Sequence, residues 1–100
     1  MEFLKELVRR GTFADKGYFQ YAHIVAVELP KNLRESLDQL VNGPVSDGDI
    51  IGKQYRDHLI DIGLGVRVCR HGEQGFTGAT YFAYSVNKII KEISCGKIPE

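Results

Sequence analysis

The feature that most constrains the fold is an amphipathic segment that ends at a glycine and is followed by a strand-like segment. Four apolar side chains recur along it at helical spacing: Ile51, Tyr55, Leu59 and Ile62. This spacing predicts a helix over Lys53–Ile62 with one buried face. Gly63 is placed as the helix stop, and Leu64 is expected to turn back into the core. Val66–His71 then alternates in polarity as a strand does.

A second strand-like segment follows a glycine-rich connection. Ala79–Ser85 alternates, with Thr80, Phe82 and Tyr84 predicted on one strand face. Between the two strands, Gly72–Gly78 is predicted to be a flexible loop. Together these segments predict a β-hairpin.

Further helices are predicted from apolar spacing and from glycine or proline stops. They cover Met1–Arg10, which Gly11 ends; Pro30–Val41, which Asn42-Gly43-Pro44 ends; a short segment capped by Ser46 or Asp47 that reaches Ile51; and Val86–Ile93. Residues 94–100 are left as a tail.

The segment Tyr18–Leu29 is apolar on all sides and permits two interpretations. Its aromatic and β-branched residues favour a strand, which is the expectation preferred here. Tyr18, Ala22, Val25 and Leu29 also fit the buried face of a helix. Periodicity does not decide between the two.

Length and composition indicate an ordinary globular protein. The 100 residues suit one domain, and 13 basic side chains balance 13 acidic ones. Neutral charge argues against strong binding to nucleic acid, unless the basic residues gather on one face. The two cysteines, Cys69 and Cys95, make no disulfide framework, so we expect a cytoplasmic protein. No signal peptide or membrane span is expected, since no apolar run approaches roughly 18 residues.

The order helix, short helix, helix, hairpin, helix resembles a winged helix-turn-helix domain of the α+β class. The resemblance covers Pro30–Ile93 and gives a single domain 1–100, with an extension at 1–29, a core at 30–93 and the tail at 94–100. The core would hold three helices and a C-terminal hairpin wing, with extra helices at both ends. The passage Leu59–Val68 is similar to the point where the recognition helix ends and the wing begins in small regulators of the MarR and PadR families.

This resemblance implies a sequence-specific DNA-binding transcriptional regulator. In such domains a helix reads the major groove and the wing touches the neighbouring backbone. Carried onto this chain, base edges would be met by Lys53, Gln54 and Arg56, and phosphates by Ser46, Arg67, Arg70 and His71. A homodimer on double-stranded DNA is expected, paired through Met1–Leu29 and the last helix.

A protein-interaction module on the same scaffold, without nucleic-acid binding, is the alternative. It is favoured by the neutral charge and by three acidic residues near the implied reading surface, Asp57, Asp61 and Glu73.

No catalytic or metal-binding pattern emerges. Cys69 and His71 fall on one face of the predicted strand, but no paired spacing supplies the remaining ligands of a closed zinc site, which needs about four. Cys69 is better explained as a core or edge residue than as a nucleophile. We therefore expect no enzyme activity, no cofactor and no small-molecule substrate.

Overall fold

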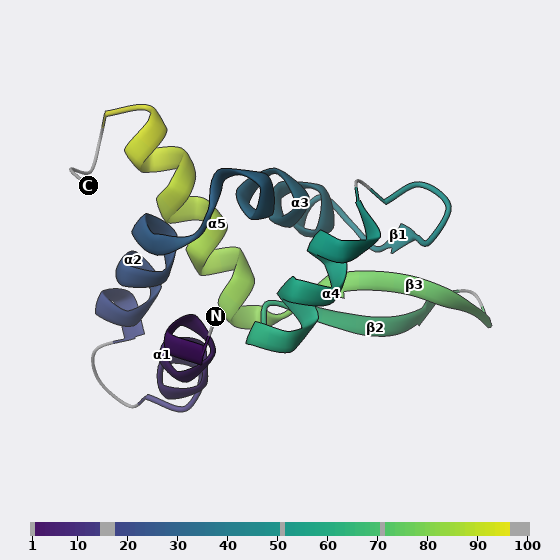
Figure 1. Ribbon diagram of the computed structural model, residues 1–100, viewed down its shortest axis with the longest axis horizontal. Coiled ribbons are helices and arrows are strands. Elements are labelled where there is room, and N and C mark those ends of the chain that lie inside the picture. The colour runs from purple at the N-terminus through teal and green to yellow at the C-terminus, as the bar shows by residue number, and fades with distance from the viewer. Residues whose placement is uncertain (1, 15–17, 51, 71, 97–100) are drawn as a thin grey trace.

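The computed structural model describes residues 2–14, 18–50, 52–70 and 72–96. Within them the chain is an α+β protein with five helices and three strands (Figure 1). The elements are α1 (Glu2–Thr12), α2 (Tyr18–Glu28), α3 (Lys31–Val41), β1 (Val45–Ser46), α4 (Lys53–Ile62), β2 (Gly65–Arg70), β3 (Glu73–Ala79) and α5 (Tyr81–Ser94). The strands form one antiparallel sheet in the order β1-β3-β2. None of the helices in these ranges is long and apolar enough to cross a bilayer.

The core lies among the helices, and the β2–β3 hairpin extends away from them at one end of the molecule (Figure 1). At the centre, the Phe82 ring meets the Tyr18 ring edge-on, with 5.1 Å between ring centroids. A Cβ atom at Gly11 would lie 2.6 Å from Cζ of Phe82. Gly11 therefore lies within α1 as a point of close packing, and its expected role as a helix stop is wrong.

The expected strand at Tyr18–Leu29 is also wrong, because α2 is a helix. Ala22, Val25 and Leu29 are buried, as the helical interpretation required. The helix presents one side to α1 and another to α5, and this packing selects it over the strand that propensity favoured.

The short helix expected from Ser46 or Asp47 to Ile51 is not formed. Val45 and Ser46 instead pair with β3 as strand β1, and a turn occupies residues 47–49. Ile51 lies outside the described residues. Pairing with β3 satisfies backbone groups that a helix would otherwise have bonded within itself.

The hairpin is placed earlier in the chain than expected. The predicted loop Gly72–Gly78 is mostly strand β3, and the predicted strand Ala79–Ser85 is mostly the first turn of α5. Arg70 pairs with Glu73, so the connection is short, and Gly72 adopts a left-handed φ of 79° there.

Burial explains why the segment after Thr80 is helical. Phe82, Ala83 and Val86 are buried while Tyr81 and Tyr84 are exposed, which is a helical and not an alternating pattern. The predicted helix Val86–Ile93 is thus the later part of α5.

The predicted junction of helix and strand at Gly63 is confirmed. α4 runs from Lys53 to Ile62, and Gly63 ends it in the left-handed conformation with a φ of 94°. Leu64 is fully buried. Pro30 precedes α3 and Asn42 follows its last residue, as expected from the sequence.

The neighbouring aromatics Phe82 and Tyr81 provide a matched test of this packing. Phe82→Ala should lower the free energy of unfolding by about 3–5 kcal/mol, because it leaves a cavity between α1, α2 and α5. Tyr81→Ala should change it by less than about 0.5 kcal/mol, since that ring is 92% exposed. Urea unfolding followed by circular dichroism measures both, and equal losses would contradict the placement of the core.

Candidate nucleic-acid interface

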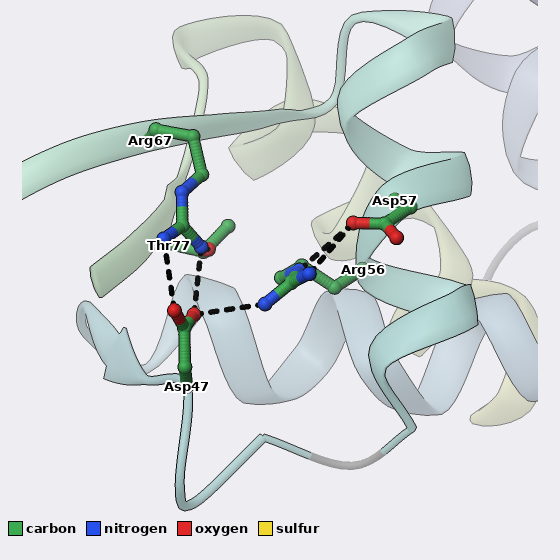
Figure 2. Close-up of polar contacts among 5 residues, drawn as sticks. All are labelled: Asp47, Arg56, Asp57, Arg67 and Thr77. Carbon is green, nitrogen blue, oxygen red and sulfur yellow. Dashed lines mark hydrogen bonds and ion pairs between the residues drawn. The ribbon is translucent and has the colours of Figure 1, made fainter. Parts of the chain in front are cut away.

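The predicted contact residues lie on α4, on β2 and on the segment between β1 and α4. Lys53 and Gln54 form the exposed start of α4. Arg56 follows on the same helix, and Arg67 projects from β2. Figure 2 shows the two arginines meeting at one carboxylate, that of Asp47, which comes from the turn after β1.

Asp47 binds Arg67 through both carboxylate oxygens. Nη1 of Arg67 donates to Oδ1 of Asp47 at 2.7 Å, and Nη2 donates to Oδ2 at 2.9 Å. This two-point pairing fixes both the distance and the orientation of the guanidinium. Nη1 of Arg67 also donates to the hydroxyl of buried Thr77 on β3, at 2.8 Å.

Arg56 is held between two carboxylates. Its Nη1 donates to Oδ1 of Asp47 at 2.9 Å, and its Nε donates to Oδ1 of Asp57 at 3.0 Å. The side chain of Arg56 is 15% exposed, against 44% for that of Arg67. A base contact by Arg56 would require its release from this pocket, whereas Arg67 is reached from solvent.

The cluster of Asp47, Arg56, Asp57 and Arg67 carries two positive and two negative formal charges and is neutral. Hydrogen bonding from Arg67, with the charges of Arg67 and Arg56, lowers the pKa of Asp47 to about 2. The same pair raises the pKa of Arg67. Both groups are therefore ionised at neutral pH.

The backbone fixes the position of Asp47. Its N–H donates to the carbonyl of Gly75 at 2.9 Å, immediately beyond the β1–β3 pairing. Gly75 has a φ of 90°, and a Cβ atom there would lie 3.6 Å from Oδ2 of Asp47. The turn after β1 is thus tied to β3 by its main chain and to β2 by its carboxylate.

Both acidic side chains of α4 are paired with basic side chains. Asp57 pairs with Arg56, and Asp61 lies 3.6 Å from Nζ of Lys5 on α1. These are all the carboxylates of α4. Their repulsion of phosphate is reduced accordingly, although exposed pairs of this kind are screened by salt.

Three other predicted contact residues either lie apart from the cluster or are not fully described by the structure. Ser46 belongs to β1, and its hydroxyl donates to Oδ2 of Asp49 at 2.9 Å. The helix N-terminus from which Ser46 was expected to bind phosphate is not formed in the described residues, because a turn occupies residues 47–49. Arg70 ends β2 opposite Glu73, and nothing is described of its side chain. His71 lies outside the described residues.

Asp47 is predicted from the sequence only as a helix cap, and its central role in the cluster is not. Arg56 and Arg67 follow Asp47 at separations of 9 and 20 residues, which no local motif links. Thr77 was missed because its segment was taken for a loop.

No protein-family model, curated protein or solved structure matches this chain. Within the described ranges, no three His, Cys, Asp or Glu side chains come together as a metal site would require. The arrangement of α4 and the hairpin is therefore the basis for proposing a function.

The low pKa of Asp47 predicts a specific dependence on pH. Because it lies below the ordinary value of 3.8, the pair stabilises the fold above that pH, and the contribution is lost as pH falls through about 2. In Arg67→Gln the pKa of Asp47 should rise toward 3.8, measured by NMR titration of the carboxyl carbon. Glu6 is the internal control, since Arg9 and Arg10 lower its pKa to about 2 independently. An unchanged Asp47 pKa in the variant would contradict the pairing.

Proposed function

We propose that this chain is a DNA-binding transcriptional regulator on a winged-helix scaffold. One observation carries the proposal: a single tight junction at Gly63 joins α4 to the β2–β3 hairpin, and Lys53 and Gln54 at the start of α4 are exposed. A helix so placed can enter a major groove while the hairpin follows the backbone. The short helix expected before α4 in such a domain is replaced along the chain by strand β1 and the turn at residues 47–49.

The side chains at the start of α4 suit this role. Lys53 and Gln54 are both exposed there. Glutamine pairs with adenine through two hydrogen bonds, and lysine donates to guanine or to phosphate. The pairing of Asp57 and Asp61 with cations reduces the repulsion of phosphate that the sequence alone suggested.

A protein-interaction module without DNA binding is the second candidate, and a specific observation favours it. The two arginines nominated for DNA contact, Arg56 and Arg67, are ion-paired within the chain. A surface whose cations are already neutralised releases few counterions from DNA and binds it weakly.

We further propose that a second copy of the chain packs on the outer face of α2 and α5. A largely apolar groove runs there, lined by Tyr18, Phe19, Ala22, Ser85 and Ile89, with Lys88 and Glu92 on its α5 side. Phe19 is 59% exposed in the free chain. Two α5 helices crossing antiparallel about a two-fold axis midway between Lys88 and Glu92 would place Lys88 opposite Glu92 of the second copy, so that this surface is complementary to itself.

Binding to random duplex DNA at increasing salt tests the first proposal. Affinity should fall steeply with salt, and Lys53→Gln should weaken binding and reduce the salt slope by about 1, as expected for one lost phosphate contact. Lys31→Gln is the matched control, because Lys31 is exposed at the far end of the helical layer beside Ser94. No binding at low salt would favour the interaction module instead.

Charge exchange on α5 tests the dimer. Lys88→Glu should dissociate it, since two carboxylates would then face each other, and the double variant Lys88→Glu with Glu92→Lys should restore it. Light scattering after size exclusion measures the mass. A dimer unaffected by Lys88→Glu, or a monomer at every concentration, would contradict the proposed pairing.

A further inference from the structure

The Asp47 carboxylate occupies the position on Arg67 that a phosphate group would take. A guanidinium binds carboxylate and phosphate with the same parallel two-bond geometry. The two contacts, at 2.7 and 2.9 Å, have the length and pairing of that geometry. We propose that Arg67 is a binding site for a DNA phosphodiester and that Asp47 blocks this site in the free protein. Arg56 remains the partner of Asp47 when Arg67 binds the phosphate. The inference rests on the proposed DNA-binding function.

Exposure indicates which arginine would move. Arg67 is 44% exposed and Asp47 37%, so Arg67 can turn from one anion to another without unpacking the core. Arg56 is 15% exposed and is held by Asp57 as well. When Arg67 turns to a phosphate, Asp47 keeps Arg56 as its partner, and no charge is left buried without a counterion.

Because its backbone is tied to β3, Asp47 always competes with phosphate for Arg67. Its backbone bond to Gly75 and the adjacent β1–β3 pairing keep the carboxylate beside β2 whether or not DNA is present. A tethered group acts at a high effective concentration, which lowers the apparent affinity of any free anion for Arg67. A single phosphate is therefore disfavoured, whereas a duplex that also engages α4 can displace Asp47.

The test compares Asp47→Asn with Asp49→Asn in binding to the same random duplex. Both remove one negative charge from the same turn, but Asp49 accepts from Ser46 and not from the arginines in the described contacts. Asp47→Asn should bind several-fold more tightly than the wild type at low salt, because Arg67 then meets the phosphate without first leaving a tethered carboxylate. Asp49→Asn should resemble the wild type.

A double variant tests whether the gain in DNA affinity depends on Arg67. Adding Arg67→Gln to Asp47→Asn should abolish the increase, as expected when two residues act as a unit. Fluorescence anisotropy gives the affinities, and circular dichroism verifies that each variant is folded. If Asp47→Asn does not fold, Asp47→Ser takes its place, since serine is also neutral and suits a turn.

Failure of this inference is distinct from failure of the proposed function. If the wild type binds DNA and the two asparagine variants gain equally, or the gain survives loss of Arg67, then Asp47 is not a competitor. If neither the wild type nor Asp47→Asn binds at low salt, the DNA-binding function itself is overturned, and the inference with it.

Discussion

Thr80 holds the C-terminus of α4 to the start of α5, and the placement of the hairpin depends on this contact. Its hydroxyl donates to the carbonyl of Gly63 at 2.9 Å, and its N–H donates to the carbonyl of Leu64 at 3.0 Å. The N–H of Leu64 in turn donates to the carbonyl of Leu59 at 2.9 Å, which closes the end of α4. The N–H groups of Gly63 and Leu64 thus satisfy carbonyls at the end of α4, and Thr80 binds the two residues that follow and fixes where β2 begins.

The other side of α4 is fixed by charge. The Asp47 cluster joins the turn after β1 to α4 through Arg56 and to β2 through Arg67 (Figure 2). A helix held at its end by backbone bonds and along its side by ion pairs loses little freedom on binding, which favours recognition of a rigid partner. The same ion pairs neutralise positive charge that a DNA-binding surface needs. The proposed displacement of Asp47 accounts for both properties: the surface is preorganised in the free protein, and Arg67 becomes available to DNA when Asp47 is displaced.

Local signals in the sequence were sufficient where the chain has one clear periodicity and a glycine stop. Lys53–Ile62 and Gly63 are of this kind, and both were predicted with the correct bounds. Tyr18–Leu29 was mispredicted because a continuously apolar run fits either element, and only packing against α1 and α5 selects the helix. Gly72–Gly78 was mispredicted because its glycines suggest a loop, whereas pairing with strands on both sides extends it. Asp47 could not be found at all, since its partners are brought together by tertiary structure.

The most direct test of DNA recognition by α4 and the hairpin is to map a short duplex onto the protein by NMR. Backbone amide signals would be followed while duplex is added at low salt. The account predicts shifts concentrated in α4 from Lys53 onward and in β2 and β3, with the outer face of α2 and α5 unaffected. Shifts confined to α2 and α5, or none at saturating duplex, would contradict it.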